Sequence, residues 1–156
     1  MIPSLIALAC VLSPIVVMAT YVDDWSRDLT TNTARTSVDA ADTRLRPIQT
    51  TADTATIRER LSPAENRMPH WEIADEKPTP DGWEGFDAIE TVHLVRTTGL
   101  MRYQDDVWVL VGEPNDKGVA TVHADSRSRV GKGDLGQNPR NLRELLGHLR
   151  AWPDTE

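Results

Sequence analysis

The amino-acid sequence predicts an α+β fold, in which an antiparallel sheet of about four strands has helices covering one face, preceded by an N-terminal transmembrane helix. Three observations support this prediction: an uncharged apolar start over residues 2–22, segments rich in β-branched residues over 70–126, and leucines at helical spacing over 142–149. The chain has 156 residues, which is room for one domain with a single modest core. We therefore divide it into a membrane segment and one folded unit.

Residues 2–22 carry no charged side chain, and a helix of this length, at about 1.5 Å per residue, nearly spans a hydrocarbon core of roughly 30 Å. We expect residues 1–22 to form a single-pass membrane anchor or uncleaved signal. A cleaved signal peptide is the alternative, although no Lys or Arg precedes the apolar run. Acidic Asp23 and Asp24 follow it, which favours a body outside the cytoplasm. Trp25, directly after the span, is typical of an interfacial anchor.

The remainder divides by composition. Residues 23–50 are rich in Thr, Asp, Ala and Ser without apolar periodicity, which predicts an extended linker. Residues 51–152 alternate between helical and strand-like patterns, so we expect a single α+β domain there, followed by a short tail over residues 153–156. The only cysteine, Cys10, precedes the domain, which excludes an internal disulfide and a thiolate zinc cluster.

Six elements are expected inside the domain. Their apolar patterns predict a helix at 54–61, strands at 70–76, 88–103, 107–111 and 119–126, and a final helix from 138 to about 152. The second and third strands are expected to pair as a hairpin through residues 104–106. Asn138 followed by Pro139 is typical of an N-cap and first helical position.

Two segments of the chain resemble a known family. They are Tyr103-Gln104-Asp105-Asp106-Val107 and Ser126-Arg127-Ser128-Arg129-Val130-Gly131-Lys132-Gly133-Asp134-Leu135-Gly136-Gln137-Asn138. Their order and spacing resemble the uncharacterised family catalogued as domain of unknown function 1499, over roughly residues 50 to 150. The resemblance implies a defined domain, and it implies no activity, substrate or catalytic residue.

The second segment also contains the candidate site. The glycines and basic residues between the last strand and the last helix favour the binding of an anion. Backbone N–H groups and a helix N-terminus attract negative charge, and arginine adds paired hydrogen bonds. The candidate ligand-binding residues are Arg127, Arg129, Lys132, Asn138 and Arg140. The alternative is structural, with Asp125 and Asp134 pairing with these cations. The segment lacks the glycine and hydroxyl spacing of a nucleotide P-loop, and we predict no cofactor.

Three functions remain open. The first is a noncatalytic module at a membrane that binds an anionic ligand or a protein partner through residues 127–138. The second is a hydrolase using His123, or Asp105 with Asp106, as acid and base, so whether the chain is an enzyme stays undecided. The third is a structural subunit whose exposed sheet face docks on a membrane complex. The net charge of −7 argues against a nucleic-acid partner, and a metal site at His93 and His123 is the least favoured possibility.

Overall fold

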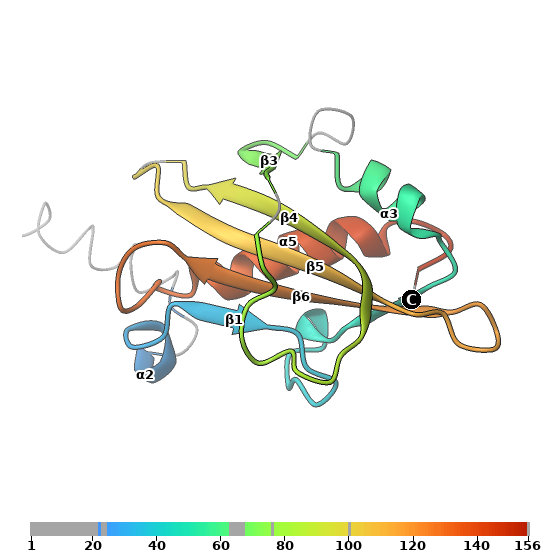
Figure 1. The fold of residues 1–156 in the computed structure, drawn as a ribbon. Coiled ribbons are helices and arrows are strands. Elements are labelled where there is room, and N and C mark those ends of the chain that lie inside the picture. Colours follow the sequence, from blue (N-terminus) through green and yellow to red (C-terminus); the bar gives the residue numbers. More distant parts are fainter. Residues whose placement is uncertain (1–21, 23–24, 63–67, 76, 100, 156) are drawn as a thin grey trace, which may run out of the picture.

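The computed structural model describes Val22 and residues 25–62, 68–75, 77–99 and 101–155 (Figure 1). The predicted transmembrane helix lies outside these ranges apart from Val22, so that prediction is untested. Within the described ranges, none of the helices has both the length and the apolar character needed to cross a bilayer.

The described chain is built around one antiparallel sheet of six strands. They are β1 (Thr33–Arg35), β2 (Ile48–Thr50), β3 (Trp71–Ile73), β4 (Ala88–Thr97), β5 (Gln104–Gly112) and β6 (Ala120–Ser128). The strand order is β1-β6-β5-β4-β3, and β2 pairs with the other end of β6. The α+β class and the antiparallel sheet are confirmed, but the sheet has six strands where about four were expected.

The two additional strands come from the segment that was expected to be a linker. In β1, Ala34 pairs with Ser126, and in β2, Ile48 pairs with Val122 and is buried. The expectation of an extended linker over residues 23–50 is therefore corrected for its described part, which contributes strands and core. Strands of three residues show no apolar pattern of their own, since pairing with β6 and not local propensity determines them.

Four helical segments complete the described chain. They are α2 (Trp25–Asp28), the 3-10 helix η1 (Thr43–Leu45), α3 (Thr54–Arg60) and α5 (Gln137–Arg150). Helix α5 crosses behind the sheet in Figure 1. Its buried leucines form one core with residues of α3 and the sheet, including Leu142, Leu145, Leu146, Leu149, Ile57, Leu61, Leu94, Val107, Val109 and Val122. The other side of the sheet faces residues 74–75 and 77–87.

The start of α5 differs from the sequence prediction. The helix begins at Gln137, and its N-cap is Gly136 with φ 74°, not Asn138. The capping acceptor is Asp134, which receives hydrogen bonds from the backbone N–H groups of Gly136 (2.9 Å) and Asn138 (2.7 Å). Because Asp134 satisfies the helix end, the Asn138 side chain is available for contacts inside the domain.

The β4–β5 connection also differs. The connection includes residues 98–99 and 101–103, where Thr98 N–H donates to the Tyr103 carbonyl over 2.8 Å. Gln104, Asp105 and Asp106, predicted as the turn, are the first residues of β5. Both aspartates are buried, so they belong to the interior of the protein and not to a solvated hairpin tip.

The status of residues 25–50 can be tested with two substitutions. Ile48→Ala should lower the free energy of unfolding by about 2–5 kcal/mol, because it removes a buried side chain from the core. Val38→Ala is the matched control: Val38 is exposed, so the change should stay within about 0.5 kcal/mol. Urea unfolding measures both, and equal small effects would restore the linker interpretation.

Candidate functional site

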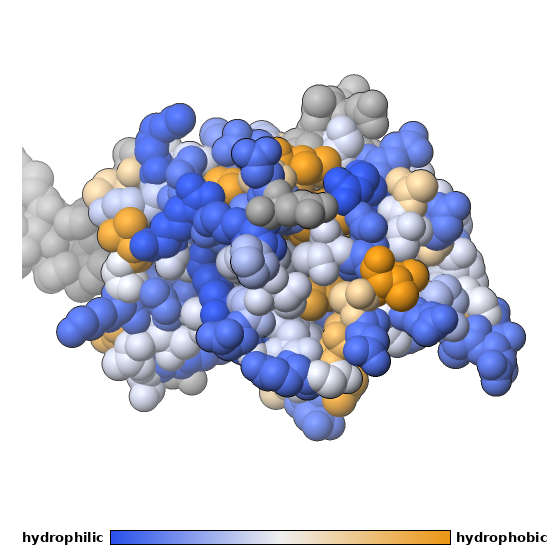
Figure 2. All heavy atoms as spheres, viewed as in Figure 1, coloured by the Kyte–Doolittle hydropathy of each residue, from blue (hydrophilic) through white to orange (hydrophobic). Residues whose placement is uncertain are grey.

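The candidate site lies on the sheet face opposite α5, called here the second face. Side chains alternate along a strand, so Asp106 of β5 and Arg127 of β6, which are cross-strand partners, both point to it. Trp108 and Asp125 form the next cross-strand pair, and Arg35 of β1 lies opposite Asp125. Figure 2 shows hydrophilic side chains crossing this face. Charged residues from strands distant in sequence are therefore neighbours here.

Asp106 is the centre of the first group of contacts. Its carboxylate accepts hydrogen bonds from Arg129 Nη2 (2.7 Å) and Nε (3.1 Å), and from Lys77 Nζ (2.7 Å). His93 Nε2 lies 2.9 Å from Oδ1 of the same carboxylate, the oxygen that also accepts from Arg129 Nη2. Burial on its own would raise the pKa of Asp106, but the hydrogen bonds from Arg129, Lys77 and His93 lower it to about 2. Asp106 is therefore an ionised, buried carboxylate at neutral pH.

Asp125 is the centre of the second group. It accepts from Arg127 Nε (3.0 Å) and from the indole N–H of Trp83 (3.0 Å), and Arg35 Nε lies 3.7 Å away. Asp125 is also buried. We call the four basic residues around these two aspartates, Arg35, Lys77, Arg127 and Arg129, the cation cluster.

The cation cluster also holds the covering loop, which we define as residues 74–75 and 77–87. Arg35 donates to the carbonyls of Gly82 (2.8 Å) and Asp81 (3.2 Å), and Arg127 donates to the Asp81 carbonyl (2.7 Å). His93 Nδ1 lies 2.6 Å from the Asp75 carbonyl. The same side chains that neutralise the buried aspartates thus fix the loop on the second face.

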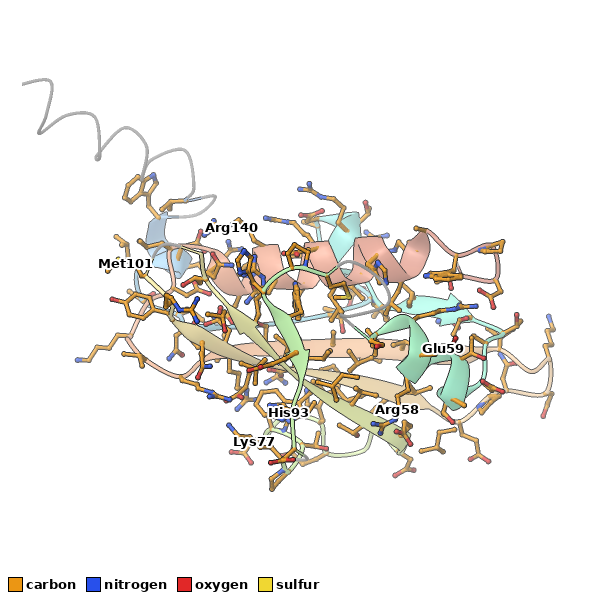
Figure 3. All side chains as sticks on the ribbon, turned by 90° about the horizontal axis from the view of Figure 1, so that it is seen from above. Arg58, Glu59, Lys77, His93, Met101 and Arg140 are labelled. Atoms are coloured by element: carbon orange, nitrogen blue, oxygen red, sulfur yellow. The ribbon has the colours of Figure 1, made fainter. Side chains whose placement is uncertain are left out.

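Two adjoining hollows lie between the covering loop and β4. Their volumes are about 430 and 490 Å³, and Thr79, Ala88 and Thr91 line both. Lys77 and His93 line the larger one, and Figure 3 shows the two side chains on the same side of the sheet. Hollows of this size are in the range that small ligands occupy. Of the cation cluster, Lys77 therefore borders a space that is open to a ligand.

The five residues predicted as one anion site do not converge. Arg127 and Arg129 lie on the second face and are paired with Asp125 and Asp106, which includes the pairing to Asp125 considered from the sequence. Lys132 is exposed in the loop after β6. Arg140 lies on the α5 side of the sheet, away from Lys77 and His93 in Figure 3, and donates to Gln137 Oε1 over 3.3 Å.

The fifth residue, Asn138, is fully buried. Its amide donates to the Asn32 carbonyl (2.7 Å) and the Ser128 hydroxyl (3.0 Å), and it accepts from Ser126 Oγ (2.6 Å). Asn141 extends this network by donating to Ser126 Oγ (3.2 Å) and, over 2.8 Å, to a carboxylate oxygen of buried Asp105. The network joins β5, β6 and α5, so Asn138 has a structural role here.

Arg35 and Lys77 were not predicted from the sequence, because one lies in the expected linker and the other in a proline-rich loop. The signal that could have indicated the site is an acidic residue inside a strand, since aspartate is depleted in strands and its presence implies a specific partner. Asp106 and Asp125 both fit that description.

The acid and base residues considered for a hydrolase are not assembled into a pair. Asp105 and Asp106 point to opposite faces of β5. His123 pairs with Leu110, four residues from Asp106 along β5, which corresponds to about 13 Å at 3.3 Å per residue. Its Nδ1 lies 2.9 Å from the Thr36 hydroxyl, and burial lowers the pKa of His123.

His93 has both ring nitrogens against acceptors, which leaves neither one directed at a substrate. His93 and His123 are on β4 and β6, which are separated by β5. Across the described ranges, histidines, cysteines and acidic residues form no group of three or more that could hold a metal ion. The arrangement favours binding and structural roles over acid–base chemistry.

The contact between Arg35 and the covering loop can be tested with two glycines. Gly82 and Gly85 both have positive φ, at 95° and 87°, so alanine at either position should cost about 1 kcal/mol or more in backbone strain. At Gly82 a Cβ atom would also collide with the Arg35 guanidinium, whereas at Gly85 the space is open. Because the guanidinium is the far end of a flexible, half-exposed side chain, Arg35 can move aside, and Gly82→Ala should destabilise in urea unfolding by only about 1 kcal/mol more than Gly85→Ala, through the loss of the Arg35 hydrogen bonds to the loop. Equal effects at the two glycines would contradict the contact.

The buried state of Asp106 gives a pH dependence. Its folded pKa of about 2 is below the value of 3.8 that is usual for a free aspartate, so its contribution to stability is present above pH 3.8 and is lost as pH falls toward 2. We expect the free energy of unfolding of the wild type to fall over this window, and Asp106→Asn to show a shallower fall. Urea midpoints at a series of pH values measure both, and parallel curves would show that Asp106 does not carry the effect.

Comparison with known proteins identifies the family. A family described as a protein of unknown function, DUF1499, matches residues 22–149. This range contains all six strands of the sheet, with the second face, and nearly all of α5. No curated protein and no solved structure matched the chain. The match starts at Val22 and so includes the segment with β1 and β2, more of the chain than the resemblance in residues 50 to 150 had indicated. The chain belongs to the DUF1499 family.

Proposed function

We propose that this chain is a membrane-anchored, noncatalytic module that binds an anionic group, a phosphate or a carboxylate of a ligand or partner, at the cation cluster. One observation carries the proposal: the four basic side chains of the cluster surround two buried carboxylates, which leaves an excess of two positive charges at close range. Glu72 and Glu84 attract Arg129 and Arg35 only at longer range. This positive excess is local to the four side chains, because Asp81, Glu84, Asp87 and Glu90 line the adjoining hollows.

The cluster is both fixed and accessible. Its side chains are between 28% and 45% exposed, while the aspartates that orient them are buried. A cation that is already held in place loses little conformational entropy when a ligand binds, which favours affinity. Lys77 also lines the hollow of about 490 Å³, and it makes one hydrogen bond to Asp106, which leaves ammonium protons for an anion.

The two other functions considered from the sequence have less support. The hydrolase lacks an assembled acid–base pair, as described above. A structural subunit that docks through an open sheet face is not favoured either, because the covering loop occupies the second face and α5 occupies the first.

Binding can be tested with the full chain in detergent, using inorganic phosphate and citrate as probes at matched ionic strength. Lys77→Gln removes a charge but leaves Asp106 with His93 and Arg129, so the fold should persist. We expect the variant to bind the probes about tenfold more weakly in calorimetry, because a hydrogen bond to a charged group contributes about 1.5 kcal/mol or more.

Lys117→Gln is the matched control. Lys117 is exposed in the turn between β5 and β6, so its loss changes the net charge equally without touching the cluster. The proposal fails if the wild type binds neither probe, or if the two variants weaken binding equally, since that would indicate a general charge effect.

A further inference from the structure

Exposed hydrophobic side chains gather at one end of the domain. Nine large hydrophobic residues are exposed in the part of the chain that the structure describes, and five of them are near this end. We call these five the apolar end: Trp25, Leu29, Met101, Tyr103 and Val130, which are 47% to 68% exposed. Large groups of exposed apolar side chains are uncommon on the surface of soluble proteins, and they indicate an interaction site.

Three segments that are distant in sequence form the apolar end. After α2, Asn32 Nδ2 donates to the Gly131 carbonyl (2.9 Å), and Leu135 N–H donates to the Asp28 carbonyl (3.0 Å). These bonds hold the α2 segment against the loop after β6. The backbone of Arg129 in turn donates to the Gln104 carbonyl (3.1 Å), next to the β4–β5 turn.

The figures agree with these contacts. In Figure 1, α2, the loop after β6 and the β4–β5 turn lie together at the left end of the molecule. In Figure 3, after a quarter turn, α2 and Met101 are again at the left end. The segments that carry the apolar end thus lie at one tip of the sheet in both views.

Basic residues accompany the apolar end. Arg102 lies between Met101 and Tyr103, and Lys132 follows Val130 by two residues; both are exposed. Two acidic residues of the described segments are engaged, because Asp28 is buried and the Asp134 carboxylate caps α5, while Asp23 and Asp24 precede Trp25 in the sequence. Aromatic and aliphatic side chains bordered by exposed cations are typical of surfaces that enter the interfacial region of a bilayer.

The start of the chain points to the same occupant. The sequence contains 21 residues, from 2 to 22, without a charged side chain, which is the composition of a membrane segment, and only Asp23 and Asp24 separate this run from Trp25. That sequence reaches the described domain at Val22 and α2, and α2 belongs to the apolar end. A bilayer that held the apolar segment would meet this end of the domain first.

We propose that the apolar end is a bilayer-docking surface, in which Trp25, Leu29, Met101, Tyr103 and Val130 enter the lipid interface while Arg102 and Lys132 contact the headgroups. This surface adjoins the cation cluster at Arg129 and Val130 but shares no residue with it, so the inference rests on the membrane anchor of the proposed function and not on the anion that the cluster binds. It predicts a fixed orientation in which the sheet strands point away from the membrane.

The test uses the full chain with Cys10→Ser and a single introduced cysteine carrying an environment-sensitive fluorophore, reconstituted in phosphatidylcholine liposomes with and without phosphatidylglycerol. Val130→Cys and Met101→Cys place the fluorophore in the apolar end, where exposed side chains are replaced without loss of core. Lys117→Cys is the control, because the β5–β6 turn lies at the opposite end of the sheet (Figure 1).

We expect the fluorophore at positions 130 and 101 to be quenched several-fold by lipids that carry a nitroxide near the headgroup, and to be protected from aqueous iodide. At position 117 the pattern should be reversed. Lys132→Glu, combined with either apolar-end label, should reduce the lipid quenching most in the liposomes that contain phosphatidylglycerol.

Three results would overturn the inference. The first is iodide quenching without lipid quenching at positions 130 and 101, which would mean that the domain stands off the bilayer. The second is protection from both quenchers, which would mean that a second copy or another protein covers the surface. The third is failure of the full chain to float with liposomes. Phosphate binding at the cation cluster is measured separately and is unaffected by any of these outcomes.

Discussion

The burial of two carboxylates on one face of the sheet is the constraint on which most of the described structure depends. Asp106 and Asp125 occupy positions in β5 and β6 where an apolar residue would be the ordinary choice. An unpaired buried charge costs several kcal/mol, so each needs basic partners with good geometry. The partners come from β1, β6 and the covering loop, which must therefore be in place for the central strands to be stable.

This requirement explains why the first strand and the covering loop belong to the domain. Arg35 is on β1, and its guanidinium reaches both Asp125 and the loop carbonyls at Asp81 and Gly82. Removing β1 would leave Asp125 with one cation and would remove the Arg35 contacts to the loop, which Arg127 and His93 would still hold in part. The two sides of the sheet consequently differ in kind: apolar packing against α5 holds one face, and ion pairs with the covering loop hold the other.

The parts of the fold that were predictable from the sequence are those with local patterns. The leucines of α5 and the β-branched residues of β5 carry a periodicity that depends only on near neighbours, and both elements were placed correctly within a few residues. In contrast, β1 and β2 are strands only because β6 pairs with them, about 90 and 70 residues away. No window of sequence around Thr33 or Ile48 contains that information.

Of the candidate site, some of the basic residues were predictable from the sequence, but their pairing with buried carboxylates was not. The cations Arg127 and Arg129 are evident in the sequence as charges before a glycine-rich loop, which gives an anion site as the natural interpretation. Their carboxylate partners are in other strands, and alternation along β5 and β6 decides that Asp106 and Asp125 share a face with them. Asn138 was misassigned for a related reason, because Asp134 caps the helix and frees Asn138 for the buried network.

The cation cluster and the apolar end meet at consecutive residues. Arg129 belongs to the cluster and Val130 to the apolar end, so β6 leads from the buried carboxylates directly to the tip of the sheet. If the tip lies on a bilayer, the strands run away from it and the second face stands roughly perpendicular to the membrane plane. A ligand would then reach Lys77 from the side, while the adjoining hollow, lined by residues 88–91 of β4, lies toward the end of the sheet that is farther from the bilayer. Anionic lipids give the membrane surface a negative charge that attracts basic side chains. The cation cluster would lie near that surface, and its buried aspartates would keep the four basic side chains in position.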